Sequence, residues 1–288
     1  MTLIYFLCRS PTGNRIQSID GAFENLTELK ILYLSWNRIE AINVGTFKDT
    51  TSLETLYLSG NRIEAIYDGT FKDTSLKTLD LSGNRIKAIN VGTFKDATSL
   101  ETLYLSGNRI EVINVGAFKD TTSLKNLYLG GNRIEVINVG TFKDTTSLET
   151  LDLGNNKITH LNQGVFSGLA SLRILDAGYN NIQSIDGDFE DLTQLRYLYM
   201  DYNNLTKLPK FPKQIQQMYA RYNNIQSIDG DFEDLTQLGY VFLENNDLTK
   251  LPKFPKQIKE IYASYNNIQS IDGAFEDLTQ LSELYVIF

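Results

Sequence analysis

The sequence predicts an α/β repeat fold: a solenoid with a parallel β-sheet on its concave side and mostly irregular returns on its convex side. Three observations predict it. A phrase of the form LETLYLSGNRIEAI begins at Leu53 and returns with small changes along the chain. Within the phrase, apolar and polar residues alternate as in a strand with one buried face. No linker rich in Pro, Gly or Ser separates the phrases, so we expect them to stack on one another.

The repeats follow the pattern L-x-x-L-x-L-x-x-N-x-I-x-x-I. So many successive matches indicate a repeat architecture and not chance. The units start at Leu29, Leu53, Leu76, Leu100, Leu124, Leu148, Leu172, Leu195, Ile215, Leu238, Ile258 and Leu281. We therefore expect one domain over residues 1–288, with an N-terminal cap and partial repeat (1–28), long repeats (29–194), alternating repeats of 20 and 23 residues (195–280) and a truncated last repeat (281–288).

Each position of the repeat has a predicted role. In Leu56-Tyr57-Leu58 the two leucines face the core and the tyrosine faces outward. The Asn of each unit lies where the chain turns off the strand, and its amide can bond backbone groups that the turn leaves inside, forming an asparagine ladder. The later Ile pair and a Phe of the return, such as Phe71, complete the core.

The second half of the chain uses a different repeat length. Residues 195–237 and 238–280 repeat a 43-residue phrase whose shorter unit ends in LTKLPKFPKQI. Proline fixes an extended backbone and supplies no amide donor. Pro209, Pro212, Pro252 and Pro255 therefore predict short returns of polyproline type and not helices.

These units resemble extracellular-type leucine-rich repeats. The xxIxxxxFxxLxxL returns are typical of animal receptors and secreted immune proteins, and the 20/23 alternation with LPKFPKQI is similar to the small leucine-rich proteoglycans. The resemblance covers nearly the whole chain. It implies a curved leucine-rich-repeat solenoid that binds proteins or glycans on its concave sheet, in an extracellular or secreted setting. The disulfide-bonded caps usual in these proteins are missing, because Cys8 is the only cysteine; an intracellular, trimmed or engineered array therefore stays open.

The outward strand positions are the candidate ligand-binding residues. Tyrosine offers a broad apolar face and one polar tip at low entropic cost, which suits a recognition surface. The central column is Tyr33, Tyr57, Asp80, Tyr104, Tyr128, Asp152, Asp176, Tyr199, Tyr219, Phe242, Tyr262 and Tyr285. A second column, just before the Asn, holds Trp36, Tyr179, Tyr202, Tyr222 and Tyr265. The alternative interpretation is that neighbouring aromatic side chains only stabilise the sheet.

A flanking column alternates in charge along the stack. Opposite charges on adjacent strands compensate each other, so we interpret this column as a solvated ladder and not as a specificity code. It comprises Glu54, Lys77, Glu101, Lys125, Glu149, Arg173 and Arg196.

Composition and motifs argue against several function classes. The net charge of −8 and pI near 4.8 disfavour nucleic acid as a partner. The apolar run from Leu3 to Cys8 is too short for a secretory leader and predicts a strand or cap, and no run is long enough for membrane insertion. The only histidine, His160, lacks a catalytic constellation, so we expect no enzyme.

No metal or cofactor is expected either. Two acidic clusters could attract calcium, but they lack the spacing of a calcium loop, and capping of turns is the preferred interpretation. The clusters are Asp186, Asp188, Glu190 and Asp191, and Asp229, Asp231, Glu233 and Asp234. Asn25 and Asn204 begin sequons that would accept glycans only in a secreted protein.

The predicted function is non-enzymatic recognition of a protein ligand, or of a glycan, on the concave face, for instance in immune recognition or as a secreted effector. The alternative is a structural or designed repeat scaffold that associates through its ends. The last repeat supports a homodimer through Tyr285, Ile287 and Phe288, because strand groups and apolar side chains there lack a cap. Leu281, Leu284 and Val286 should face inward.

Overall fold

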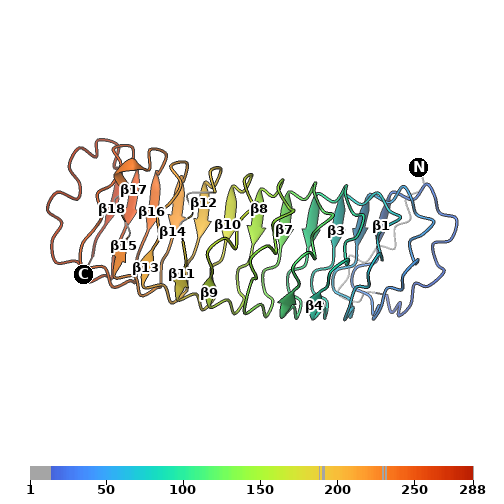
Figure 1. The fold of residues 1–288 in the computed structure, drawn as a ribbon. Coiled ribbons are helices and arrows are strands. Elements are labelled where there is room, and N and C mark those ends of the chain that lie inside the picture. Colours follow the sequence, from blue (N-terminus) through green and yellow to red (C-terminus); the bar gives the residue numbers. More distant parts are fainter. Residues whose placement is uncertain (1–13, 188, 190–191, 229, 231, 288) are drawn as a thin grey trace. The chain divides into compact units, whose positions relative to one another are not determined.

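The computed structural model describes residues 14–187, 189, 192–228, 230 and 232–287. The chain forms two compact units: the first extends to residue 150 and includes residues 165–169, and the second comprises residues 151–164 and 170–288. Each unit is a solenoid in which one repeat makes one coil and contributes one strand to a parallel sheet (Figure 1). The predicted repeat solenoid is confirmed, and the single domain over 1–288 stays a prediction.

The first unit contains five successive strands of the large sheet. They pair in parallel, and equivalent residues of successive repeats lie side by side, as Leu56 does with Leu79. The middle residue of each strand is buried and its neighbours are half-buried, which confirms the predicted alternation. The strands are β1 (Ile31–Tyr33), β2 (Thr55–Tyr57), β3 (Thr78–Asp80), β5 (Thr102–Tyr104) and β7 (Asn126–Tyr128).

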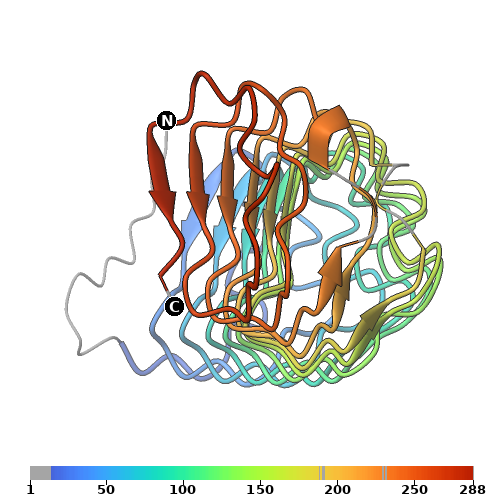
Figure 2. The ribbon, with the colours of Figure 1, turned by 90° about the vertical axis from the view of Figure 1, so that its left-hand side faces the viewer.

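The chain passes from the first unit to the second within β8 (Thr150–Asp152). The second unit then continues the same pattern, and Figure 2 shows its later strands (orange to red) along one side of the coil, with the returns opposite. These strands are β10 (Ile174–Asp176), β12 (Tyr197–Tyr199), β14 (Gln217–Tyr219), β16 (Tyr240–Phe242), β17 (Glu260–Tyr262) and β18 (Glu283–Tyr285). All pair in parallel with their neighbours.

The returns contain three short strand pairs that the sequence analysis did not predict, because two residues are too few to show a periodicity. They are β4 (Ala88–Ile89) with β6 (Val112–Ile113), β9 (His160–Leu161) with β11 (Ser184–Ile185), and β13 (Lys207–Leu208) with β15 (Ser227–Ile228). One 3₁₀ helix, η1 (Phe232–Asp234), is the only helical element among the described residues. The proline-containing returns are not helical, as predicted.

The asparagine ladder is present and links successive coils. Asn61 donates from its amide nitrogen to the carbonyls of Leu34 and Leu58, both at 2.9 Å, and its Oδ1 accepts from the Ile39 N–H at 3.0 Å. Asn61 itself is buried. Each such side chain therefore satisfies backbone groups of its own coil and of the preceding one, which would be costly to leave unpaired inside.

Phenylalanine side chains form the outer part of each core. In the first unit the ring centroids of Phe23 and Phe47 lie 5.7 Å apart, and those of Phe47 and Phe71 lie 6.1 Å apart. In the second unit, Phe211 and Phe254 of the proline-containing returns are also buried and pack beside Phe232. Sequence reasoning missed these two because their returns depart from the consensus spacing.

Candidate binding surface

The outward third residues of the large-sheet strands form a column of stacked rings, here named the tyrosine column. In the second unit Tyr199, Tyr219, Phe242, Tyr262 and Tyr285 stack in order, with neighbouring centroids 4.5–4.9 Å apart. In the first unit Tyr33 stacks on Tyr57 and Tyr104 on Tyr128, each pair at 4.8 Å. The ring spacing matches the distance between adjacent strands, so the parallel register produces the stacking.

Aspartate replaces the aromatic residue at three positions of this column. Asp80, Asp152 and Asp176 each accept a hydrogen bond from the backbone N–H two residues on, at 2.8–2.9 Å. In the second unit a Cβ built on Gly154 would lie 3.2 Å from Asp152 Oδ1 and 3.3 Å from Asp176 Oδ1, so both carboxylates border that glycine. Burial raises the pKa of both carboxyls, and the bonds from Gly154 and Gly178 oppose the rise.

The residue before each ladder Asn has a left-handed backbone, and these residues are here named the left-handed column. It contains aromatic residues in five coils, with φ of 59°, 53°, 55°, 54° and 59°, namely Trp36, Tyr179, Tyr202, Tyr222 and Tyr265. All five are exposed, by 40–65%. In four coils of the first unit the position is glycine: Gly60, Gly83, Gly107 and Gly131. The sequence showed the column, but the backbone conformation that it imposes on the aromatic residues was not foreseen.

The position between the two columns carries a charged group that sequence reasoning missed. Asp201 Oδ1 accepts from the backbone N–H of Arg221 at 2.7 Å, and Oδ2 binds the guanidinium at 2.7 Å. The guanidinium lies 5.4 Å from the ring centroid of Tyr219 and 5.5 Å from that of Phe242. The first four coils have serine here, at positions 35, 59, 82 and 106. The change from serine to a charged residue at this position was the sequence signal that could have identified the group.

Glu244 follows Arg221 in the next coil. Its Oε2 is buried and has no hydrogen-bond partner among the described residues. Burial raises the pKa of this carboxyl, and the charge of Arg221 opposes the rise. The second unit therefore holds an unsatisfied carboxylate oxygen on the face that bears the aromatic columns.

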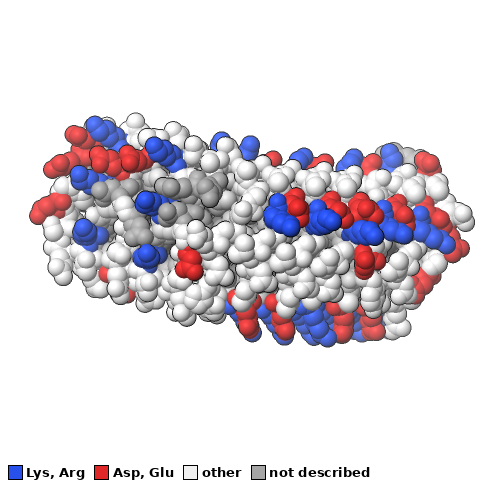
Figure 3. All heavy atoms as spheres, in the orientation of Figure 1, with Lys and Arg blue, Asp and Glu red and all other residues white. Residues whose placement is uncertain are grey.

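The alternating charges of the first unit form the predicted ladder. Lys77 binds Glu54 and Lys125 binds Glu101, each at 2.9 Å, and all four side chains are substantially exposed. A further exposed row, on the returns, pairs Lys87 with Glu64 at 3.2 Å. Figure 3 shows acidic and basic side chains side by side in rows on the first unit. Such pairs contribute little to stability and leave no field of one sign.

The C-terminal residues lie partly as expected. Tyr285 stacks on Tyr262 and is 45% exposed, and Leu284 lies in register with the buried Ile261. Leu284 is nevertheless 42% exposed, because no described strand pairs with the other edge of β18. Ile287 is 60% exposed. Phe288 lies outside the described residues, and self-association through Tyr285, Ile287 and Phe288 stays a prediction.

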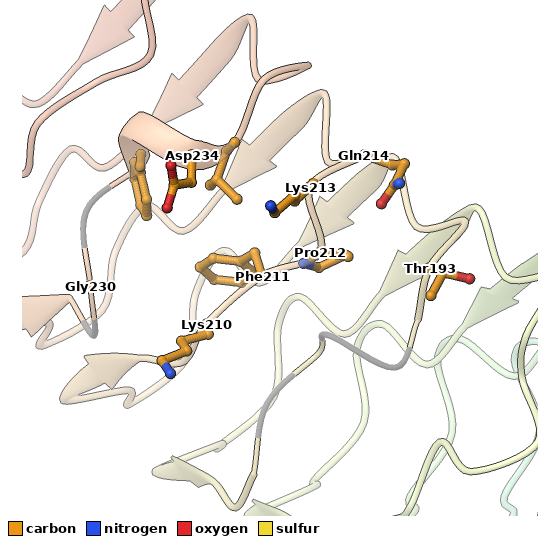
Figure 4. Close-up of a pocket in the computed structure, with 10 residues that line it drawn as sticks. Thr193, Lys210, Phe211, Pro212, Lys213, Gln214, Gly230 and Asp234 are labelled. Carbon is orange, nitrogen blue, oxygen red and sulfur yellow. The ribbon is translucent and has the colours of Figure 1, made fainter.

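The return side of the second unit has two hollows. One, of about 580 Å³, is lined by Lys210, Phe211, Pro212, Lys213 and Asp234, among others, and Figure 4 shows Phe211 among these side chains. The other, of about 630 Å³, is lined by Thr249, Lys250, Pro252 and Asp272, among others. Neither lining contains histidine or cysteine. His160 is exposed in β9, where its Nδ1 lies 3.0 Å from the hydroxyl oxygen of Thr159.

The predicted acidic clusters are only partly visible. Asp188, Glu190, Asp191, Asp229 and Asp231 lie outside the described residues, as does Cys8. Among the residues that are described, no three His, Cys, Asp or Glu side chains are placed to hold a metal ion. The same part of the chain contains no helix that is long and apolar enough to cross a membrane. Asn25 and Asn204 are both exposed.

Comparison with known families agrees with the geometry. The family described as "Leucine rich repeat" matches residues 12–63, 27–86, 74–134 and 122–182, and "Leucine Rich repeats (2 copies)" matches residues 170–213. A comparison with curated proteins gave no match.

Solved structures share the fold. A chain in the octameric complex of latrophilin 3, Unc5D and the leucine-rich repeats of FLRT2 is 25% identical, with a TM-score of 0.71 over 88% of this chain and 73% of the other. A chain of the Toll–Spätzle complex of Drosophila is 20% identical, with a TM-score of 0.72 over 89% of this chain and 41% of the other. A chain of the TLR13–ssRNA13 complex is 22% identical, with a TM-score of 0.62 over 94% and 48%.

Proposed function

Since the chain belongs to the leucine-rich-repeat family, we propose that it is a non-enzymatic recognition protein that binds a protein ligand on the outward face of its large-sheet strands. One observation carries this proposal: on the strand face, exposed aromatic side chains of the left-handed column accompany the half-buried stacked rings of the tyrosine column, and in the second unit they recur in three successive coils. Aromatic residues are enriched in recognition surfaces, and exposed apolar patches of this kind mark interaction sites.

The solved relatives support the proposal at the level of the fold. Two of them are described in assemblies with other proteins: FLRT2 with latrophilin 3 and Unc5D, and Toll with Spätzle. A third relative is described in a complex with single-stranded RNA. For this chain, the net charge of −8 favours a basic or weakly charged protein over an RNA, because RNA binding requires clustered cationic side chains.

Stabilisation of the sheet by stacked rings is compatible with binding. Each stacked pair contributes roughly 0.5–1.5 kcal/mol beyond its buried area, which favours the tyrosine column whether or not a ligand is present. The left-handed column differs, because its side chains are largely exposed and strain the backbone. Stabilisation of the fold therefore explains the tyrosine column better than it explains the left-handed column.

We also infer an extracellular role, such as immune recognition or that of a secreted effector. Its support is the repeat type and the exposure of Asn25 and Asn204, the two sequon asparagines. Expression through a secretory pathway should attach glycans at these positions. A loss of mass on glycosidase treatment, absent in Asn25→Gln/Asn204→Gln, would support this setting; an unmodified secreted protein would contradict it.

The ligand-binding face is tested by affinity capture followed by substitution. The chain is used to capture proteins from extracts of its source, and the affinity of each captured protein is then measured for Tyr104→Ala/Tyr128→Ala. We expect a loss of more than about 1 kcal/mol if this stacked pair is a central anchor. The matched control is Tyr67→Asn, an exposed tyrosine on a return, where other repeats have asparagine. Full affinity in a folded double variant, with loss in the control, would place the site on the returns.

A further inference from the structure

The left-handed column contains tyrosines that the coil itself does not require. The N–H of Gly60 binds the carbonyl of Ser82 at 2.9 Å, and the N–H of Tyr202 makes the equivalent bond to Arg221, also at 2.9 Å. Glycine at this position therefore makes the same backbone hydrogen bond that tyrosine makes. A residue with a Cβ in the left-handed conformation costs roughly 1–2 kcal/mol, a cost that glycine avoids.

Three of these tyrosines form a ridge in successive coils of the second unit. The ring centroids of Tyr179 and Tyr202 lie 4.5 Å apart, and those of Tyr202 and Tyr222 lie 4.3 Å apart. The three residues are 59%, 40% and 45% exposed. Stacking contributes about 0.5–1.5 kcal/mol per pair beyond the buried area, whereas the left-handed backbone costs roughly 1–2 kcal/mol per residue. At least two fifths of each side chain still faces solvent, and a continuous exposed aromatic ridge of this kind marks an interaction surface.

A charged strip separates this ridge from the tyrosine column. It consists of Gly178, Asp201, Arg221 and Glu244, each two residues after a member of that column. Asp201 already neutralises Arg221 through the bonds described above. Asp176 borders the strip at one end, and at the other Glu244 has a carboxylate oxygen without a hydrogen-bond partner among the described residues. With three carboxylates and one guanidinium, the strip and its border are acidic.

We propose that the strip binds an extended, basic segment of a protein partner, with the tyrosine ridge packed against the stem of its lysine or arginine side chains. This inference rests on the proposed function, and it specifies the chemistry of the ligand. A guanidinium or ammonium group would add a charged hydrogen-bond donor beside the carboxylates of Asp176 and Glu244. The long apolar stems of these side chains cover aromatic surface while the charged head reaches a carboxylate, and arginine also stacks on aromatic rings.

The strand spacing defines the segment further. The carboxylate of Asp176 accepts from the N–H of Gly178 at 2.9 Å, and Gly178 and Glu244 occupy equivalent positions after β10 and β16. The two acidic ends are therefore separated by three strand steps, or roughly 14 Å at about 4.8 Å a step. An extended chain advances about 3.4 Å per residue and presents every second side chain on one face. Two basic residues separated by three others therefore lie on one face at nearly the same distance. A segment crossing the strands should carry them at positions i and i+4.

The test is a selection of random-sequence peptides displayed on phage against the full chain. We expect enriched peptides to carry Lys or Arg at i and i+4, and to bind more weakly as salt is raised. Glu244→Gln and the triple substitution of Tyr179, Tyr202 and Tyr222 by Gly should each weaken binding at least tenfold. Tyr67→Asn, the exposed tyrosine of a return, should leave binding unchanged. Thermal unfolding of every variant checks that the fold is retained.

The other outcomes separate this inference from the proposed function. Enriched peptides without paired basic residues, or with affinity that Glu244→Gln leaves unchanged, would overturn the basic segment, while a loss on Tyr104→Ala/Tyr128→Ala would keep recognition on the sheet face. Binding that depends only on residues of the returns would overturn both. If the triple glycine variant fails to fold, Glu244→Gln and the salt dependence still decide the question.

Discussion

The carboxylate of Asp201 holds Arg221 at two points, the backbone N–H at 2.7 Å and the guanidinium at 2.7 Å, and so joins two successive coils of the second unit. The Asp201 side chain is 11% exposed and that of Arg221 is 36% exposed. Hydrogen bonding to Asp201 raises the pKa of Arg221, which favours the charged guanidinium. A fixed pair of this kind orients the guanidinium beside the rings of Tyr219 and Phe242.

Breaking this pair should destabilise the second unit. Arg221→Met leaves the carboxylate of Asp201 largely buried without its cation, so we expect a loss of about 1–3 kcal/mol in the free energy of unfolding. The measurement is urea denaturation of Arg221→Met, of Asp201→Ala and of the double variant Asp201→Ala/Arg221→Met. Together the three give the coupling energy between the two side chains. The exposed pair of Lys77 and Glu54 is the control, with an expected coupling of about 0–1 kcal/mol. A coupling energy between Asp201 and Arg221 that is no larger than that between Lys77 and Glu54 would contradict this prediction.

The left-handed backbone of Tyr202 predicts an unusual order of stability. Alanine keeps the strained Cβ and loses the ring, whereas glycine loses the ring but removes the strain. We expect Tyr202→Gly to be more stable than Tyr202→Ala by about 1 kcal/mol, measured by denaturant unfolding. The control is Tyr219, a strand residue, where alanine should be the more stable of the two. A Tyr202→Ala variant that is more stable than Tyr202→Gly would argue against the left-handed conformation.

Asparagines of the ladder should contribute more to the free energy of unfolding than asparagines of the returns. Asn108 donates to the carbonyls of Leu81 and Leu105, both at 2.9 Å, and accepts from the Ile86 N–H at 3.0 Å. Asn108→Ala leaves these buried groups without a partner, so a loss of about 1–3 kcal/mol is expected on thermal or urea unfolding. Asn114→Ala, which removes an exposed bond to Asn90, should change stability by less than about 0.5 kcal/mol.

Asp176 should make stability depend on pH. Burial raises its pKa, so the folded protein holds this proton more tightly than the unfolded chain does. The ionised carboxylate is therefore a net cost at neutral pH, and that cost disappears as pH falls through the raised pKa. We expect Asp176→Asn, which keeps an oxygen for the Gly178 N–H, to raise the unfolding midpoint at pH 7.

The size of that gain provides the check. It should shrink as pH falls and vanish below the ordinary carboxyl pKa of 3.8. Asp73→Asn, at an exposed position of a return, should show no gain at either pH. A gain for Asp176→Asn that stays constant from neutral to acid pH would mean that titration of this carboxyl is not its cause.

Much of the fold could be predicted because successive repeats bury the same apolar positions and satisfy the same backbone groups. The strand alternation at Leu56-Tyr57-Leu58, the buried Asn61 and the stacked Phe47 and Phe71 all follow from spacing that returns in successive coils of the first unit. The buried Phe211 and Phe254 escaped prediction, because their proline-containing returns have lost that spacing. The short strands β4 and β6 escaped it because backbone pairing between returns leaves no pattern in two residues.

The sequence by itself determined the repeat frame, the inward and outward positions, and the candidate aromatic columns, since side-chain direction in a strand depends only on parity. Only the tertiary structure decided that Tyr179, Tyr202 and Tyr222 have left-handed backbones and stack into a ridge. It also decided that Asp201 neutralises Arg221 while a carboxylate oxygen of Glu244 stays without a hydrogen-bond partner among the described residues. The reason is physical: backbone torsion, ring stacking and the pairing of charges depend on which atoms neighbouring coils bring together in space, and no single repeat contains that information.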